Sequence, residues 1–201
     1  WMHTWITVVE TVFGFLIAVV IGVGLGAMLG KLPRLEQTMN PFIVATQVVP
    51  KVALVPLFVV WFGFGLAPKI IIAAILAFFP ILMNTILGVK SVDRGHREVL
   101  LSLNASRWQI VTQLEFPSAL PYILTGMEMG IVLSIIGAVV GEYLGGNEGL
   151  GYLAVATMNA FQTDRLFGIV ILLSVMGFAL YLALTSLRRV LVPWHRSAEG
   201  G

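Results

Sequence analysis

Residues 93–121 read DRGHREVLLSLNASRWQIVTQLEFPSALP and separate two long apolar stretches of the chain. Charged residues and helix-start signals are concentrated here, whereas the flanking stretches have almost none. Asp93 can cap a helix over residues 94–103, because its side-chain oxygen accepts a hydrogen bond from an otherwise unpaired amide of the first turn. Asn104 then suits the left-handed position that ends a helix. The stretch therefore begins with a short helix and a sharp turn.

A second helix start follows the turn directly. Ser106 and Gln109 have the spacing of a capping box, in which each side chain bonds the other residue's backbone amide. We expect this helix to run to Glu115 and to stop before Pro117, because proline cannot donate to the helical ladder. Residues 90–117 therefore predict a compact helix–turn–helix loop.

The composition places the rest of the chain in lipid. Of 201 residues, 58% are hydrophobic and 11% are charged, whereas soluble domains carry about 25% charged residues. A net charge of +2 gives no reason to expect nucleic acid as a partner. The chain has no cysteine and three widely separated histidines, so we expect no metal site.

Five segments are long and apolar enough to cross a bilayer, which takes about 20 residues. They are residues 5–28, 41–63, 70–89, 121–144 and 166–187. Each must satisfy its own backbone hydrogen bonds in lipid, so all five should be helices. We expect an all-α, polytopic membrane protein with a single transmembrane domain over residues 1–201.

Prolines and glycines modify these spans. Pro50 and Pro56 should interrupt the second span, and Pro80 lies inside the third. In the first span, glycines recur at every fourth position, at residues 22, 26 and 30. Such a repeat lets another helix approach closely, so we expect this face to pack against a helix.

The basic residues fix the orientation that we expect. Nine of them lie on one side of the membrane: Lys31, Arg34, Lys90, Arg94, Arg97, Arg107, Arg188, Arg189 and Arg196. The opposite connections hold only Lys69 and Arg165, and Lys51 is inside a span. By the positive-inside rule, residues 90–117 and the C-terminus are cytoplasmic and the first residues are outside. A start outside suggests a further span upstream, making six in the full-length protein.

The loop resembles a known signature. Glu98-Val99-Leu100, Asn104 and the segment 114–117 are similar to the EAA loop of ATP-binding-cassette importer permeases, which reads EAA, three residues, Gly, nine residues, then I-x-L-P. Val99 and Leu100 replace the two alanines, Asn104 replaces the glycine, and Leu114 and Phe116 replace Ile and Leu. The sequences at residues 49–65, 104–109, 116–126 and 141–153 resemble those of the nitrate, sulfonate, taurine and bicarbonate branch of these permeases. The likeness therefore covers nearly the whole chain.

This resemblance implies partners. The loop would be a coupling helix that docks on an ATP-binding subunit through Arg97, Glu98, Asn104, Ala105, Ser106 and Arg107. The chain would work as a homodimer with two ATP-binding subunits and an extracytoplasmic substrate-binding protein, in a bacterial cytoplasmic (inner) membrane. ATP-driven closure would move the spans as rigid bodies. The alternative for the loop is an amphipathic helix lying on the membrane surface.

The chain itself should not bind or hydrolyse ATP. Gly30-Lys31 is the nearest match to a phosphate-binding loop, but the pattern needs a glycine at position 25 and Ser or Thr at position 32. Both positions hold leucine. We therefore expect a transport subunit rather than an enzyme, with ATP and Mg²⁺ bound by the partner.

Placing a polar or charged residue inside a membrane span costs free energy, so such residues are candidates for the transport pathway. They are Gln47, Lys51, Asn84 and Glu128. Lys51 would either attract an anionic substrate or have a structural role, for example paired with Glu128. Asn84 would either line the pathway or bridge backbone near Pro80.

Residues 145–165 are too short and glycine-rich for a full crossing. The resemblance implies a re-entrant outer segment near the contact with the substrate-binding protein, with Glu142, Glu148, Asp164 and Arg165 at that mouth. The alternative is a plain solvated loop.

We therefore expect the permease subunit of an ATP-driven importer for a small anionic or organic solute, such as a sulfonate, nitrate or taurine. An ATP-independent secondary transporter or channel is the alternative. That class usually shows paired repeats and buried coupling carboxylates, and here only Glu128 qualifies. A membrane-embedded enzyme is disfavoured, because no catalytic motif is present.

Overall fold

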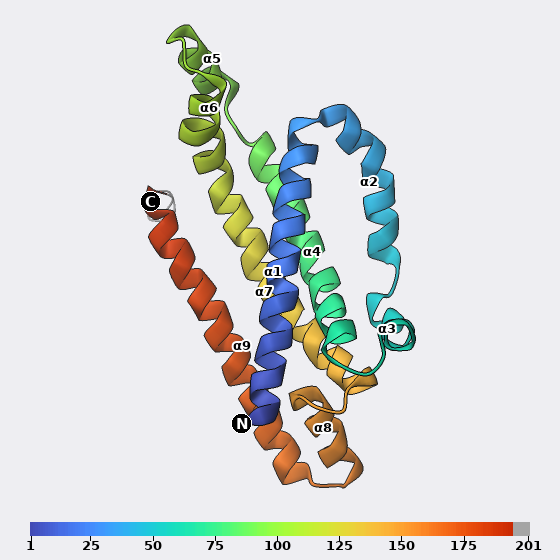
Figure 1. The fold of residues 1–201 in the computed structure, drawn as a ribbon. Helices are drawn as coiled ribbons and strands as arrows, with labels where there is room; N and C mark the ends of the chain where they lie inside the picture. Colours follow the sequence, from blue (N-terminus) through green and yellow to red (C-terminus); the bar gives the residue numbers. More distant parts are fainter. Residues whose placement is uncertain (195–201) are drawn as a thin grey trace.

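The structure is a computed structural model that describes residues 1–194, so Arg196 lies outside the described residues. The described part consists of helices and their connections, with no strand. Its elements are α1 (Met2–Lys31), α2 (Pro33–Val48), the 3₁₀ turn η1 (Lys51–Leu54), α3 (Val55–Phe62), α4 (Leu66–Lys90), α5 (Arg94–Ser102), α6 (Arg107–Ile110), the π turn η2 (Val111–Glu115), α7 (Phe116–Gly145), α8 (Leu150–Asn159) and α9 (Thr163–Leu191). Figure 1 shows the long helices side by side, with α5 and α6 projecting at one end. We call this the loop end, and the opposite end, where the chain begins, the N-terminal end.

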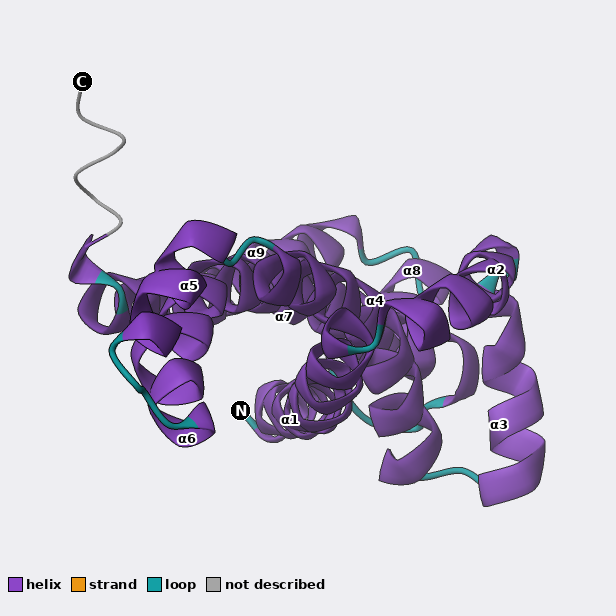
Figure 2. Ribbon diagram, turned by 90° about the horizontal axis from the view of Figure 1, so that it is seen from above, coloured by secondary structure: helices purple, strands orange, loops and turns teal. Residues whose placement is uncertain are grey.

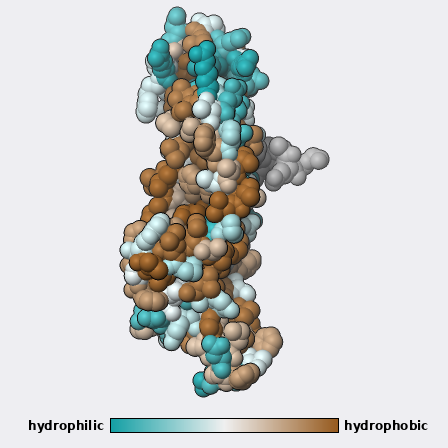
Figure 3. Space-filling view, turned by 90° about the vertical axis from the view of Figure 1, so that its right-hand side faces the viewer, coloured by the Kyte–Doolittle hydropathy of each residue, from teal (hydrophilic) through white to brown (hydrophobic). Residues whose placement is uncertain are grey.

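Four helical segments of residues 1–194 are long and apolar enough to cross a membrane, and the number rises to five when the bent pair of α2 with η1 and α3 is taken as one span. The four are α1, α4, the run from α6 to α7 (Arg107–Gly145) and α9. The all-α polytopic fold with five spans is thereby confirmed. Figure 3 shows hydrophobic side chains over the middle of the molecule and hydrophilic ones gathered at the loop end.

The second span differs from its prediction. It begins at Pro33 rather than at residue 41, and its two halves are bent by 76° at Val49 and Pro50. Pro50 breaks the helix as predicted, because it cannot donate a backbone hydrogen bond. Pro56 does not interrupt a helix, since it lies in the first turn of α3, where a missing amide is tolerated. Figure 2 shows α2 and α3 on one flank of the molecule and α5 and α6 on the other.

The prediction that the loop's second helix stops before Pro117 is wrong. The helix continues from α6 through η2 into α7, and Pro117 lies in the first turn of α7. A π turn is one residue wider than an α turn, which relieves the clash between a proline ring and the preceding turn. A single helical run of 39 residues therefore connects the loop to the N-terminal end.

The glycine face of α1 packs on α4, as the repeat predicted. A methyl group on any of the four glycines of this face would lie 2.5–3.0 Å from an atom of α4. The facing pairs are Gly14–Ala73, Gly22–Ile81, Gly26–Thr85 and Gly30–Val89. The residue numbers differ by 59 in every pair, so the two helices are parallel.

The same stretch of α4 also packs against glycines of α7. Gly126 and Gly130 face Ile81 and its neighbours, while Gly137 faces Ala73. Residue numbers rise on one helix as they fall on the other, so this pair is antiparallel. The central helix is therefore α4, and buried Ala77 and Ile81 lie in the main apolar core.

Candidate functional site

The loop end has the local structure that its sequence predicted. Asp93 Oδ1 accepts from the His96 amide at 3.1 Å and caps α5. The amides of His96 and Gly95 stabilise the charged carboxylate, which holds the pKa of Asp93 below its usual value. Asn104 has φ of +56°, the left-handed conformation expected of it. The predicted helix start and turn are confirmed.

The capping box is also present. The Ser106 amide donates to Gln109 Oε1 at 2.7 Å, and the Gln109 amide donates to Ser106 Oγ at 3.3 Å. These two bonds fix the direction in which α6 leaves the turn. The loop is therefore a projecting unit with a defined shape, and the structure brings the six predicted docking residues together on it: Arg97, Glu98, Asn104, Ala105, Ser106 and Arg107.

Four apolar side chains on this unit are exposed at an otherwise hydrophilic end, and three of them lie away from the bundle side of α5, on which Leu101 lies. Trp108 is 74% exposed, Leu103 72% and Val99 58%. Exposed apolar side chains grouped together mark an interaction surface. The sequence analysis identified Val99 as a departure from the signature, but its predicted docking residues did not include Val99, Leu103 or Trp108. We call Val99, Leu103 and Trp108 the apolar tip.

One ion pair links the loop to α1, and others lie within the loop and between α4 and α2. Glu115 in η2 lies 2.7 Å from Lys31 Nζ at the end of α1 and 4.0 Å from Arg97. Lys90 at the end of α4 pairs with Glu36 of α2 at 2.8 Å. Each such exposed pair contributes only about 0–1 kcal/mol, so their role is to fix geometry rather than to hold the fold.

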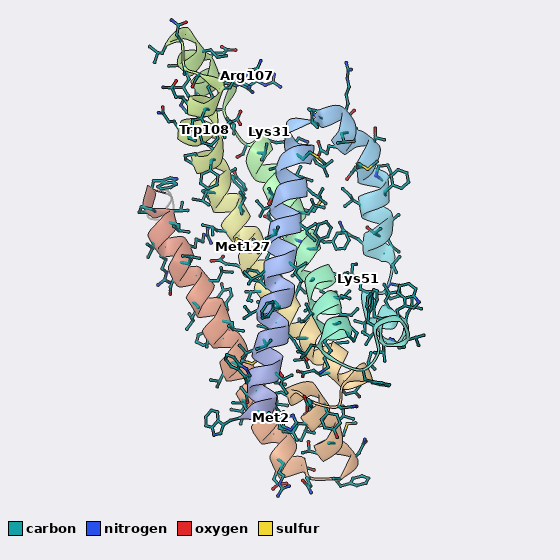
Figure 4. The ribbon with its side chains drawn as sticks, viewed as in Figure 1. Met2, Lys31, Lys51, Arg107, Trp108 and Met127 are labelled. Atoms are coloured by element: carbon teal, nitrogen blue, oxygen red, sulfur yellow. The ribbon has the colours of Figure 1, made fainter. Side chains whose placement is uncertain are left out.

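Two of the four predicted pathway residues lie together. Gln47 and Lys51 line a cavity of about 320 Å³ beside Phe79 and Pro80 of α4. Lys51 Nζ donates to the Gln47 carbonyl at 3.1 Å and lies 4.8 Å from the centre of the Phe79 ring. Figure 4 shows Lys51 where the second span breaks. The cavity therefore holds one cation, one amide side chain and one aromatic ring.

The other two pathway candidates lie elsewhere. Asn84 Nδ2 donates to the carbonyl of Pro80 at 2.8 Å, which fits the expected bridge to backbone near that proline. Glu128 does not pair with Lys51, so that alternative is wrong. It faces α9 instead, where Arg188 Nη1 lies 3.0 Å from its carboxylate.

Glu142 is not at the outer surface, so the expectation that it contacts a partner protein is wrong. Its side chain is fully buried, accepting from Thr7 Oγ1 at 2.6 Å and from the Gly151 amide at 2.6 Å. The Leu150 amide donates to Thr7 Oγ1 at 2.9 Å. Glu142 therefore fastens the start of α8 to α1.

A buried ion pair lies beside it. Lys69 Nζ donates to Glu10 Oε1 at 2.8 Å and to the Glu148 carbonyl at 3.1 Å. Sequence reasoning placed Lys69 in an exposed connection, which is wrong because α4 already begins at Leu66. The glycine repeat of α1 could have indicated that Glu10 faces another helix, because Glu10 lies four residues before Gly14 on the same helix face.

The segment after α7 is not a plain solvated loop. It contains α8, with Leu150, Gly151 and Thr157 buried. Glu148 and Asp164 remain exposed at the N-terminal end, as does Arg165, which donates to Gln162 Oε1 at 2.9 Å. These three residues are accessible to a partner, and their role stays a prediction.

Known proteins are similar to this chain in sequence and in fold. Residues 7–197 match the family described as "Binding-protein-dependent transport system inner membrane component". The chain is 37% identical over 183 residues to the formylaminopyrimidine transport permease protein ThiX of Halalkalibacterium halodurans, covering 91% of this chain and 73% of the relative. It is 38% identical over 197 residues to the riboflavin transport system permease protein RibX of Chloroflexus aurantiacus, covering 98% and 74%.

The fold has a counterpart among solved structures. A chain from the inward-facing MetNI methionine ABC transporter matches with a TM-score of 0.79 and 19% identity, covering 93% of both chains. At this identity the likeness shows the arrangement of the helices.

Proposed function

We propose a function from the premise that the chain belongs to the family of binding-protein-dependent transport system inner membrane components. It is a transport permease subunit of that family. In the proposed assembly, two copies form a translocation pathway in a bacterial cytoplasmic membrane. Two ATP-binding subunits supply the energy, and an extracytoplasmic binding protein delivers the solute.

The loop end is the proposed docking site for the ATP-binding subunit. The observation that carries this assignment is the apolar tip, three exposed apolar side chains on a rigidly capped unit. The uninterrupted helical run from α6 to α7 supports the mechanism, because a push on the loop is transmitted along one continuous helix. In this arrangement the loop end is cytoplasmic.

The cavity beside Lys51 is the proposed stretch of the solute pathway. A cation and an aromatic ring together suit a small organic solute with an anionic or electron-rich group. Sulfonates and taurine have that chemistry, and so do the pyrimidine and flavin solutes that the relatives' names carry. At the other end, the exposed residues Glu148, Asp164 and Arg165 are the proposed contact with the binding protein.

The test is solute uptake by the reconstituted complex with the apolar tip altered. Leu103→Asp should reduce uptake and solute-stimulated ATP hydrolysis by roughly tenfold or more, because burying a charge in an apolar contact is costly. Phe167→Asp is the matched control, since Phe167 is exposed at the opposite end. Phe167→Asp should leave ATP-subunit binding unchanged.

Two results would overturn the proposal. Normal uptake and hydrolysis by Leu103→Asp would remove the docking assignment. Uptake by the chain alone in liposomes, without ATP, would instead favour a secondary transporter.

A further inference from the structure

A second, larger cavity lies between the loop and the bundle. It measures about 630 Å³ and is bounded by the ends of α1 and α4, by α5 and by the run from α6 into η2. This volume lies within the range of small-molecule sites, about 300–1,000 Å³. The cavity is separate from the one beside Lys51, with which it shares no residue.

Its lining is basic. Lys31, Arg94, Arg97 and Arg107 face two acidic residues, Asp93 and Glu115. Figure 4 shows Lys31 at the end of α1 and Arg107 at the start of α6. Four cations against two carboxylates leave an excess of positive charge around one solvent-accessible cavity.

Both carboxylates are already engaged. Asp93 accepts from the first turn of α5, and Glu115 lies 2.7 Å from Lys31. Arg97 is at the limit of an ion pair with Glu115, at 4.0 Å. Within residues 1–194, Arg94 and Arg107 form no ion pair and no side-chain hydrogen bond. Two guanidinium groups therefore line the cavity with their donors free.

The basic side chains lie on the face of α5 opposite the apolar tip. Arg94, Arg97 and Leu101 are spaced at three and four residues and line the cavity. Val99 and Leu103 lie on the other face and are exposed. A partner that covers the apolar tip would therefore leave the cavity side of α5 free, so Arg97 and Arg107, which the resemblance implied for docking, are assigned here to the cavity instead.

We propose that this cavity binds a phosphate-bearing anion, and that the headgroup of an anionic phospholipid is its source. Guanidinium groups match phosphate oxygens with paired hydrogen bonds. Apolar side chains such as Val89 and Ile110 line the same cavity and suit the glycerol and first carbons of a lipid. The cavity lies where α1 and α4 end, and basic pockets at the cytoplasmic ends of membrane helices bind such headgroups.

The occupant would connect parts of the molecule that now share one ion pair. Lys31 belongs to the bundle, whereas Arg94 and Arg107 belong to the loop. A phosphate between them would hold the loop against α1. This inference rests on the proposed function for the cytoplasmic position of the loop end. Binding is measured without transport, so it can fail while the proposed function stands.

The experiment measures retained lipid by native mass spectrometry of the purified transporter complex. Samples receive equal amounts of phosphatidylglycerol and phosphatidylcholine with identical acyl chains. The test variant combines Arg94→Gln with Arg107→Gln. The matched control combines Arg34→Gln with Arg189→Gln, two exposed arginines that do not line the cavity. Equal thermal unfolding temperatures check that both variants are folded.

The unaltered protein should retain phosphatidylglycerol over phosphatidylcholine. The test variant should retain it about tenfold less, and the control should match the unaltered protein. Equal retention of phosphatidylglycerol by the test variant and the unaltered protein would overturn the proposal.

A second arm uses millimolar inorganic phosphate without added lipid. Phosphate binding that the test variant loses, together with no preference for phosphatidylglycerol, would support the phosphate site but assign it to a soluble anion. No preference for phosphatidylglycerol and no phosphate binding would overturn the site altogether.

Discussion

At the scale of single residues, Glu10 and Lys69 are the outermost contact of the α1–α4 series. Their separation of 59 is that of the glycine pairs, so the helix register places a carboxylate opposite an ammonium group. Both side chains are almost fully buried. A buried pair of this kind adds little net stability but is costly to break.

Lys69→Met should therefore destabilise the protein by about 3–5 kcal/mol, because it leaves the Glu10 carboxylate buried without its partner. The unfolding temperature in detergent measures this loss. The double variant Glu10→Gln with Lys69→Met should recover most of it, since no unpaired charge remains. A double variant as unstable as the single one would contradict the pairing.

Gly149 gives a second test at this scale. It has φ of +107°, and a methyl group there would overlap the Glu142 carboxylate. Gly149→Ala should lower the unfolding temperature by an amount equivalent to about 1–3 kcal/mol. Gly24→Ala is the matched control, because Gly24 has open space around its Cβ position. Equal unfolding temperatures for the two variants would show that the α7–α8 connection is not held as described.

At the scale of elements, local signals predicted the loop well. Asp93, Asn104 and the Ser106–Gln109 box act on backbone within four residues, so the sequence alone specifies them. The π turn before Pro117 was missed, because a proline normally ends a helix and nothing nearby signals the extra residue. Local sequence signals predict helix caps, but they do not predict that a long helix continues past a proline through a π turn.

The contacts between helices could not be predicted from local sequence signals either. Glu128 faces Arg188, and Lys69 faces Glu10, because helix packing sets the register between distant segments. The glycine repeat of α1 predicted a packed face but not its partner. The buried position of Glu142 likewise depends on how α8 folds back on α1.

Pro117→Ala tests the π turn. Without the proline, η2 is expected to relax to an α turn, which rotates the loop by about 100° relative to α7. Solute uptake per ATP hydrolysed should fall, while the unfolding temperature stays level or rises. Pro121→Ala is the control, because Pro121 lies inside α7 beyond the π turn. Unchanged coupling in Pro117→Ala would mean that the loop's orientation does not depend on η2.

At the scale of the whole molecule, the described helices form a bundle with α4 at its centre. The cavity beside Lys51 lies on the flank made by α2, between that helix and α4. Much of the surface of α1 and α9 is apolar and exposed. These exposed apolar faces fit the proposed pathway between two copies, with lipid covering the remaining surface.

The central claim is that the loop end contacts a separate ATP-binding subunit in the cytoplasm. The chain has no cysteine, so Leu103→Cys creates a single reactive site. Its labelling and crosslinking in the assembled complex are measured in right-side-out and inside-out vesicles. Phe167→Cys, at the N-terminal end, is the control.

The account predicts that Cys at position 103 crosslinks to the ATP-binding subunit and is labelled by an impermeant maleimide only in inside-out vesicles lacking that subunit. The position 167 control should be labelled from outside. Labelling of position 103 from outside, or no crosslink to an ATP-binding subunit that is bound, would contradict the account.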